Sequence, residues 1–449
     1  MKIAKKICAG AIAAALTALL AGVSAAADVP PPERLRARES FAKDGFGIFV
    51  HWGLYAAWGK GEWYLNKSRM PLADYEAKAA AFNPTNFDAR AWAKAFAGAG
   101  ARYVTITSRH HDGFSMFDTA QTDYDIVDAT PFRRDPLKEL AAACAGEGLG
   151  LGFYYSLLDW RRPDYPRGRA TDDYGAYFAF MTNQLSELLT GYGPVRCIWL
   201  DGEWDHGRGS GFDWRLQELY GLVHRLQPAC LVGNNSHADL LDGEDFQIWE
   251  INYPGDHAGH MNDRQTIAEG VPLECCWSTT DEAWGYNPDD PLSRMTATEI
   301  VRRLVRTRAR GANLLLNVAP APDGSIPETI RTRLAEVGEW IRRYGDTVFG
   351  TEPARYRVMA TVSTRSADGR TVWLHCMPDK ANPKYGMWMK SYDRVLAATD
   401  LMTGEPVPFV QKEHKGDRML SITLDIPEGV PDYIVRLDVE PFASPASAP

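Results

Sequence analysis

The chain has 449 residues, of which 45 % are apolar and 24 % are charged, so it is long enough for two or three globular domains and too apolar to be disordered throughout. Its formal net charge of −9 argues against a nucleic-acid partner, because phosphate binding needs a basic surface. The seven cysteines include no Cys-x-x-Cys pair, which excludes the common zinc and redox motifs and a disulfide-rich scaffold.

The first 27 residues predict a secretory signal peptide. A start with three lysines precedes an apolar run from Ile7 to Val23, and Ala25–Ala27 supplies the small residues of a cleavage site. The alternative is a membrane anchor, but a run of about 17 residues is at the lower limit for spanning a bilayer. We therefore expect an exported protein, periplasmic or secreted, with no stable membrane anchor.

Eight short apolar segments divide residues 28–350. Apolar runs of this length are typical of parallel strands that are buried on both faces. The segments cover residues 46–52, 102–107, 149–156, 195–201, 229–234, 245–251, 272–278 and 312–318. Helical patterns lie between most of them, at residues 86–99, 136–147, 174–192, 214–226, 297–310 and 330–344. This alternation predicts an α/β fold, a (β/α)8 TIM-like barrel.

The pattern changes after residue 350. Six short segments rich in β-forming residues follow, and turn signals such as Asp368-Gly369 separate them. They predict a small C-terminal antiparallel β-sandwich over residues 351–442. Residues 443–449 contain Ser, Ala and Pro almost alone, and we expect them to form a flexible tail.

Polar and aromatic residues gather where the predicted strands end. In a (β/α)8 barrel the active site lies at the carboxyl ends of the strands. Residues at or near these ends are His51, His110, His111, Tyr155, Asp201, Asn234, Asn235, Glu250, Glu274 and Asn317. Two carboxylates with His and Tyr donors and aromatic walls are typical of a glycoside hydrolase, so these ends predict an active site of that kind.

Asp201 is the strongest candidate for a catalytic carboxylate. It follows a largely apolar segment, where an unused acid would be costly, although a carboxylate that caps the next helix is the structural alternative. Glu250 ends the sixth segment, and Glu274, in the seventh, is its rival for the role of the second acid. For both, a structural salt bridge is the alternative.

Other side chains stay ambiguous from the residues alone. His110 and His111 would point to opposite faces of a regular strand, but both can reach a pocket where the strand turns into a loop. A metal site needs a third ligand at a recognisable spacing, and none is present, so we expect no metal. Glu62 with Trp63, and Trp284, can bind a sugar or simply pack in ordinary loops.

Several motifs together resemble the α-L-fucosidases of glycoside hydrolase family 29. The segments that carry the resemblance are 46–53 around His51, Glu62-Trp63-Tyr64, 108–114 around His110-His111, Trp199-Leu200-Asp201-Gly202, 245–256 around Glu250, 284–287 and 311–318. They span about residues 45–350, which is nearly the whole predicted barrel.

The resemblance implies an exo-acting retaining α-L-fucosidase that removes terminal α-L-fucose from oligosaccharides or glycoconjugates. Asp201 would be the nucleophile and Glu250 the general acid/base, with Glu274 as the alternative because the acid/base position shifts among subfamilies. Residues implied to line the fucose pocket are His51, Glu62, Trp63, His110, His111, Tyr155, Trp199 and Trp284. The resemblance implies no metal and no organic cofactor.

Two other functions remain open. One is a non-catalytic carbohydrate-binding protein on the same scaffold, and the other is an exo-glycosidase of different sugar specificity, since only the pocket around C5 separates a methyl from a hydroxymethyl group. The chain also departs from some family members, which place an arginine near the end of strand five. Here residues 232–235 read Val-Gly-Asn-Asn, so asparagine can still donate hydrogen bonds, but the charged contact to the sugar is lost.

Overall fold

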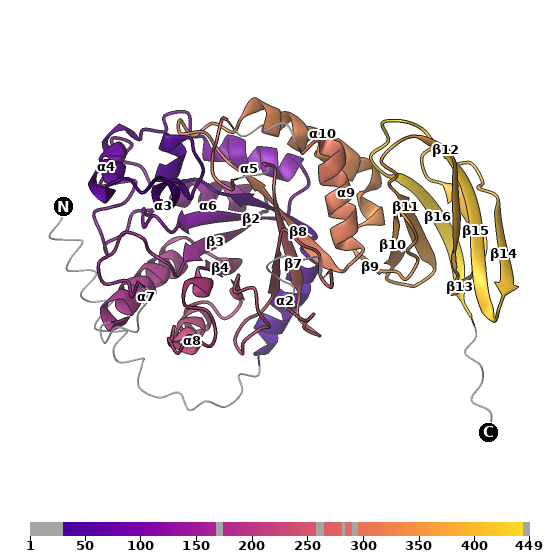
Figure 1. Cartoon of the computed structure of the whole chain (residues 1–449), viewed down its shortest axis with the longest axis horizontal. Coiled ribbons are helices and arrows are strands. Elements are labelled where there is room, and N and C mark those ends of the chain that lie inside the picture. The colour runs from indigo at the N-terminus through magenta and orange to yellow at the C-terminus, as the bar shows by residue number, and fades with distance from the viewer. Residues whose placement is uncertain (1–29, 168–173, 257–264, 281–282, 290–294, 443–449) are drawn as a thin grey trace, which may run out of the picture.

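The computed structural model describes residues 30–167, 174–256, 265–280, 283–289 and 295–442. The predicted signal peptide and the predicted tail lie outside these ranges. An eight-stranded parallel sheet comes first, and two antiparallel sheets of five and three strands follow (Figure 1). This is the predicted α/β barrel with a C-terminal β-sandwich.

The eight barrel strands coincide with the predicted apolar segments to within a few residues. They are β1 (Phe46–Val50), β2 (Tyr103–Arg109), β3 (Gly150–Ser156), β4 (Cys197–Asp201), β5 (Leu231–Asn234), β6 (Gln247–Glu250), β7 (Leu273–Ser278) and β8 (Ala312–Val318). Most of their residues are buried, because helices cover the outer face of the sheet while side chains fill its interior.

Helices surround the strands (Figure 1). They are α2 (Pro32–Asp44), α3 (Tyr64–Ser68), α4 (Leu72–Ala77), α5 (Ala89–Gly98), α6 (Pro136–Gly146), α7 (Tyr174–Gly191), α8 (Leu216–Leu226), α9 (Ala297–Arg308) and α10 (Glu328–Tyr344). Capping residues define where two of these helices begin: Asp88 caps α5, and Thr296 with Glu299 forms a capping box at α9. None of the described helices has the length and apolarity needed to cross a membrane.

The barrel has a seam between β5 and β6. The strand order is β5-β4-β3-β2-β1-β8-β7-β6, so these two strands form the ends of the described sheet, and residues 235–246 join them without a helix. Asp245 spans the seam: its N–H donates to Val232 O at 2.6 Å, and its Oδ2 accepts from Val232 N at 2.9 Å. The seam brings the residues that follow β5 beside the end of β6.

The C-terminal strands form two facing sheets. The strands are β9 (Thr351–Pro353), β10 (Thr361–Ser366), β11 (Thr371–Cys376), β12 (Asn382–Lys390), β13 (Asp393–Asp400), β14 (Phe409–His414), β15 (Asp417–Ile426) and β16 (Tyr433–Pro441). Their orders are β13-β16-β11-β10-β9 and β12-β15-β14. Alternate residues such as Leu420, Ile422 and Leu424 face inward into a shared apolar core. The sandwich lies beside α9 and α10 of the barrel (Figure 1).

Candidate active site

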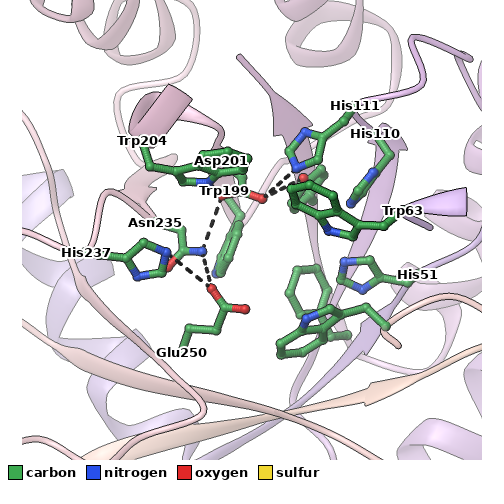
Figure 2. A pocket seen from close by; sticks show the side chains of 13 residues that line it. His51, Trp63, His110, His111, Trp199, Asp201, Trp204, Asn235, His237 and Glu250 are labelled. Carbon is green, nitrogen blue, oxygen red and sulfur yellow. Dashed lines mark hydrogen bonds and ion pairs between the residues drawn. The ribbon is translucent and has the colours of Figure 1, made fainter. Parts of the chain in front are cut away.

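A cavity of about 390 Å³ lies at the carboxyl ends of the barrel strands. That volume suits a small organic ligand. The cavity is lined by Phe49, His51, Trp63, His110, His111, Tyr154, Trp199, Asp201, Trp204, Asn235, His237, Glu250 and Trp284 (Figure 2). Of the side chains given a catalytic or sugar-binding role, Glu62, Tyr155 and Glu274 do not line it, and the others do. Of the three strand-end asparagines, Asn235 lines it and Asn234 and Asn317 do not.

Tyr154, rather than the predicted Tyr155, lines the cavity. Neighbouring residues of a strand point to opposite faces, and Tyr154 is in register with Trp199, another cavity residue. The Tyr155 hydroxyl instead donates to Gln184 Oε1 on α7 at 2.8 Å, on the helix side of the sheet. The prediction for Tyr155 therefore chose the wrong one of two adjacent tyrosines.

Glu274 lies deep in the barrel instead of at a strand end. It is the second residue of β7, four positions before the strand's carboxyl end, and it is completely buried. Its carboxyl accepts hydrogen bonds from the Tyr103 hydroxyl at 2.5 Å and from Trp199 Nε1 at 2.9 Å. Burial raises the pKa of Glu274 to about 7. Glu274 thus orients the indole of Trp199, whose ring lines the cavity.

Glu62 does not line the cavity but holds in place the loop that carries Trp284. Its Oε2 accepts the backbone N–H groups of Trp284 at 2.9 Å and Gly285 at 2.7 Å. These bonds tie the loop after β1 to the loop after β7. The carboxyl is buried, and burial raises the pKa of Glu62. The result is a fixed position for the Trp284 ring in the wall.

Five groups surround the carboxylate of Asp201, and all but the neutral His111 ring donate hydrogen bonds to it. Tyr154 OH at 2.8 Å and His111 Nε2 at 3.5 Å face its Oδ2. Its Oδ1 accepts from Gly202 N at 2.8 Å, Trp204 Nε1 at 3.1 Å and Asn235 Nδ2 at 3.3 Å. Gly202 has a φ of 94°, and a Cβ there would lie 2.7 Å from Leu158 Cβ, so this turn requires glycine. The donors orient the carboxylate and stabilise its charge.

The environment of Glu250 favours its protonated form. Burial, followed by the nearby charge of Asp201, raises the pKa of Glu250 to about 7, although hydrogen bonds from Asn235 and the Trp284 indole oppose the shift. Asn235 Nδ2 donates to Glu250 Oε2 at 2.7 Å, and His237 Nε2 lies 3.6 Å from the same oxygen. Two carboxyls with such different surroundings in one cavity can divide the roles of nucleophile and acid.

The cavity histidines are neutral. Burial lowers the pKa of His51 to about 3 and that of His111 to about 4, and it lowers the pKa of His110 strongly. His51 Nδ1 bonds Asn317 Oδ1 at 2.8 Å, and His111 Nδ1 bonds Ser156 Oγ at 2.6 Å. The Ser156 hydroxyl already donates to Leu158 O, so His111 Nδ1 must be the donor to it. In both rings Nε2 is then left as an acceptor for a ligand hydroxyl.

Aromatic rings form the walls and rim. Phe49 lies 5.0 Å from Trp199 and 6.0 Å from Trp284 between ring centroids, which gives the cavity an apolar side. Trp63 stacks on Trp204 with centroids 5.7 Å apart and planes 20° from parallel. A cavity with hydroxyl-binding groups on one side and aromatic faces on the other fits a monosaccharide that carries an apolar substituent.

Some cavity residues escaped prediction. Phe49 and His237 were not singled out, while Asn235 was noticed without an assigned role. Phe49 was recognisable, because it lies two positions before His51 on the same face of β1. His237 lies three residues beyond the end of β5 and adopts a φ of 55°. Hydrophobic periodicity does not predict such an irregular turn.

Metal and thiol chemistry have no obvious centre in the described residues. No group of three or more His, Cys, Asp or Glu side chains there is arranged to hold a metal ion. Cys144, Cys197, Cys230, Cys275, Cys276 and Cys376 are all free and buried.

Comparisons with known proteins agree with this geometry. A family model described as alpha-L-fucosidase matches residues 24–346. Plasma alpha-L-fucosidase of Rattus norvegicus is 29 % identical over 367 residues, which cover 76 % of this chain and 75 % of the rat protein. The solved structure of alpha-L-fucosidase isoenzyme 1 from Paenibacillus thiaminolyticus is 32 % identical, has a TM-score of 0.77, and is matched over 91 % of this chain and 100 % of its own.

One further solved structure bears on the chemistry. A family 29 alpha-L-fucosidase from Bacteroides thetaiotaomicron, trapped as a covalent intermediate with 2-fluoro-fucosyl fluoride, is 25 % identical with a TM-score of 0.77 over 93 % of this chain and 98 % of that one. The family match covers most of the barrel, and the cavity lies where such enzymes keep their active site. The chain belongs to the α-L-fucosidases of glycoside hydrolase family 29.

Proposed function

We propose that this chain is an exo-acting retaining enzyme that hydrolyses terminal α-L-fucose from oligosaccharides or glycoconjugates, with Asp201 as nucleophile and Glu250 as general acid/base. The observation that carries the proposal is the single nitrogen, Asn235 Nδ2, that lies 3.3 Å from Asp201 Oδ1 and 2.7 Å from Glu250 Oε2. Because both oxygens bond the same nitrogen, the distance between them cannot exceed the sum of the two hydrogen-bond distances. Retaining enzymes keep their carboxyls about 5–5.5 Å apart, whereas inverting enzymes need about 6.5–9.5 Å.

The chemistry follows in two steps. First, an Asp201 oxygen attacks C1 of fucose while Glu250 gives its proton to the glycosidic oxygen; the C1–O bond breaks and its electron pair stays with the leaving alcohol. Second, the Glu250 carboxylate takes a proton from water, whose oxygen attacks C1 and releases Asp201. Glu274 fits neither step, because it does not line the cavity.

The fucose-binding roles follow from the neutral histidines and the aromatic wall. The Nε2 atoms of His51 and His111 would accept sugar hydroxyls, and the apolar side formed by Phe49, Trp199 and Trp284 would face the C6 methyl group. A cavity of about 390 Å³ supports the binding of one terminal sugar. Glu62 and Tyr155 would act only through neighbouring residues, because neither lines the cavity.

A panel of aryl glycosides tests the proposal. Purified protein without residues 1–27 is incubated with aryl α-L-fucoside, β-D-galactoside, β-D-glucoside and α-L-arabinoside, and Asp201→Ala is assayed in parallel with and without azide. We expect release from the α-L-fucoside alone, its loss in the variant, and partial rescue by azide, which takes the place of the missing nucleophile. Proton NMR of the first product should show α-L-fucose.

Other results would favour the two alternatives. Release from the galactoside with none from the fucoside would indicate a different sugar specificity. Binding of fucose without turnover of any substrate, in protein whose circular dichroism shows a folded chain, would indicate a carbohydrate-binding protein. First formation of β-L-fucose would overturn the retaining mechanism.

We also infer that the enzyme is exported after cleavage near Ala27. The inference rests on the lysines, apolar run and alanines of residues 1–27. Amino-terminal sequencing of protein from cell fractions tests it. A mature chain that starts near Asp28 in the periplasm or medium is expected, and an intact amino terminus in the cytoplasm would contradict export.

A further inference from the structure

Asn235 lies where the two ends of the described sheet meet. β5 and β6 share no backbone ladder among the described strands, and Asn235 follows β5 directly while Glu250 ends β6. The hydrogen bond from Asn235 Nδ2 to Glu250 Oε2 therefore crosses the seam at the level of the cavity. This side chain therefore joins Glu250 to Asp201 at a place where no strand pairing among the described strands does.

The chemistry of the amide fixes its orientation. An Asn nitrogen carries two hydrogens, whereas its oxygen can only accept. Since Asp201 Oδ1 and Glu250 Oε2 both act as acceptors, the nitrogen must face them, and it can give one hydrogen to each. Asn235 Oδ1 is buried and has no hydrogen-bond partner among the described residues, as expected if the orientation is set by the two carboxyls alone.

His237 approaches the same oxygen of Glu250 from a second direction. Its Nε2 lies 3.6 Å from Oε2, and burial lowers the pKa of His237, so the ring is neutral. The buried Nδ1 has no partner among the described residues, which leaves Nε2 as the nitrogen that meets the carboxyl. The residue adopts a φ of 55°, an uncommon conformation outside glycine that is concentrated at functional sites.

The second oxygen of Glu250 has a different setting. Figure 2 shows Oε2 facing Asn235 and His237, while the other carboxyl oxygen is turned into the cavity. We propose that Asn235 and His237 are positioning residues that decide which oxygen of Glu250 carries the catalytic proton. Asn235 Nδ2 donates to Oε2 and the His237 ring lies 3.6 Å from the same oxygen, so the proton sits on Oε1, where it meets the glycosidic oxygen. This inference rests on the proposed role of Glu250 as the acid.

The same arrangement serves both halves of the reaction. In the first step the proton leaves Oε1 for the glycosidic oxygen as the C1–O bond breaks, and the Asn235 N–H on Oε2, with the His237 ring beside it, stabilises the carboxylate that forms. In the second step Oε1 accepts the proton of the attacking water. Without Asn235 and His237 the proton could equally occupy Oε2, which faces away from the substrate, and only part of the enzyme would be ready to react.

The test separates acid catalysis from nucleophilic attack by the choice of leaving group. 2,4-Dinitrophenyl α-L-fucoside needs no proton to lose its phenolate, whereas phenyl α-L-fucoside does. The variants are Asn235→Leu, which keeps the shape without the N–H groups, His237→Leu, which removes the donor, and His237→Gln, which keeps one. His237 makes no hydrogen bond to Asp201, although the charge of Asp201 acts on its ring, so the two leaving groups are needed to separate an effect on Glu250 from one on Asp201.

We expect His237→Leu to lower kcat/KM for the phenyl fucoside at least about 10-fold and to change it less than about 3-fold for the dinitrophenyl fucoside. His237→Gln should restore much of the loss. Asn235→Leu should slow both substrates, because it also contacts Asp201, but the phenyl fucoside more. The basic limb of the kcat/KM profile should move to higher pH in both Leu variants, since the carboxylate form loses a donor. The other titratable groups that face Glu250 are unchanged in these variants: Asp201, Glu62, Tyr154 and Cys276.

Asn234→Ala is the matched control. The neighbouring amide is equally buried, but it donates to Glu203 at 2.6 Å and lines no part of the cavity. This variant should leave the ratio of the two rates unchanged. Equal losses on both substrates in the His237 and Asn235 variants, or no loss at all, would overturn the inference. Failure of the wild-type enzyme to release either phenol would instead overturn the proposed function, and the inference with it.

Discussion

The side chain of Trp204 acts on Asp201 directly, through the 3.1 Å hydrogen bond from its indole N–H to Oδ1. Trp204→Phe removes this donor but keeps a ring that can stack on Trp63. A hydrogen bond to a charged group contributes about 1.5–3 kcal/mol, so we expect kcat/KM for aryl fucosides to fall roughly 10- to 100-fold. The measurement is steady-state kinetics with the dinitrophenyl fucoside, whose rate depends on the nucleophile rather than on the acid.

Trp160→Phe is the control for Trp204→Phe. Trp160 contacts Trp63 with ring centroids 5.0 Å apart but does not line the cavity or bond Asp201. Trp160→Phe should change kcat/KM less than about 3-fold, because the substitution removes no hydrogen bond to Asp201. Equal kinetics for wild type and Trp204→Phe would show that the indole donor has no role in attack.

The pH dependence should follow from the pKa of Glu250, which burial and the charge of Asp201 raise to about 7. The first step needs protonated Glu250, so kcat/KM should hold below pH 7 and fall as the pH rises through that value. The profile is measured with the phenyl fucoside between pH 4 and 9. With the dinitrophenyl fucoside, which needs no acid, the basic limb should flatten; a limb of the same depth with both substrates would contradict the assignment.

Paired substitutions distinguish the two glutamates. Glu250→Gln should lower kcat/KM for the phenyl fucoside about 100-fold or more, because general acid catalysis contributes 10²–10⁴-fold. Glu274→Gln keeps an acceptor for the Trp199 indole, and the Tyr103 hydroxyl can turn to accept, so its activity should stay within about 5-fold while its Tm falls. Loss of acid catalysis in Glu274→Gln alone would contradict this assignment.

For single residues, the sequence predicted the cavity residues that lie at strand ends. It did not predict the residues whose orientation depends on how neighbouring strands pair. Asp201 and Glu250 end β4 and β6, so the strand-end rule found them. Tyr154 could have been preferred to Tyr155 only with the β3–β4 register, in which Tyr154 is opposite Trp199. The periodicity of a single sequence does not reveal the register between two strands. His237 depends on the irregular turn after β5, which only tertiary contacts define.

Elements with a repeating pattern were predicted well, and those whose composition resembles a loop were not. All eight barrel strands and the six helices α5 to α10 agree with the apolar pattern. β12 was missed because Pro383, Gly386 and two lysines break the β-rich composition, although Tyr385, Met387 and Met389 alternate into the core. β12 is an edge strand, where proline and lysine are tolerated.

The seam between β5 and β6 should be a weak point that Asp245 stabilises. Besides its bond to Val232 N, the buried carboxylate accepts from Arg38 Nε at 2.9 Å and from His224 Nε2 at 2.8 Å. Removing one partner of a buried pair costs about 3–5 kcal/mol, so Asp245→Ala should lower Tm by several degrees. Glu218→Ala, which breaks an exposed pair with Arg215 on α8, is the control and should shift Tm by little.

The same carboxylate should make the stability of the barrel depend on pH. Burial raises the pKa of Asp245, but the hydrogen bond from His224 and the charges of His224 and Arg38 outweigh this effect and lower it. A lowered folded-state pKa contributes stability above the unfolded value, and that stability disappears as pH falls through the folded value. The Tm difference between wild type and Asp245→Ala should therefore shrink in acid. A difference that is constant with pH would contradict the role of the charge.

For the whole molecule, the sandwich should act as a structural partner of the barrel. Met377 and Ile434, from the sandwich, belong to the same buried apolar cluster as barrel residues, and Arg302 on α9 donates to the backbone carbonyls of Pro378 and Pro431. Removal of residues 351–442 would expose these apolar groups and leave the guanidinium unpaired. Because the cavity lies at the strand ends and takes no residue from the sandwich, the loss should affect stability rather than the active-site chemistry.

A chain that ends at residue 350 should therefore be less soluble and melt at a lower temperature than the full chain. Calorimetry and soluble yield measure the effect, and Arg302→Ala in the full chain provides an intermediate case that loses the hydrogen bonds to Pro378, Asp379 and Pro431 without exposing the apolar cluster. In all three proteins the folded fraction should keep the same KM for the aryl fucoside. A truncated chain with the Tm of the full chain would show that the barrel is independent, and a changed KM in the folded fraction would show that the sandwich shapes the site.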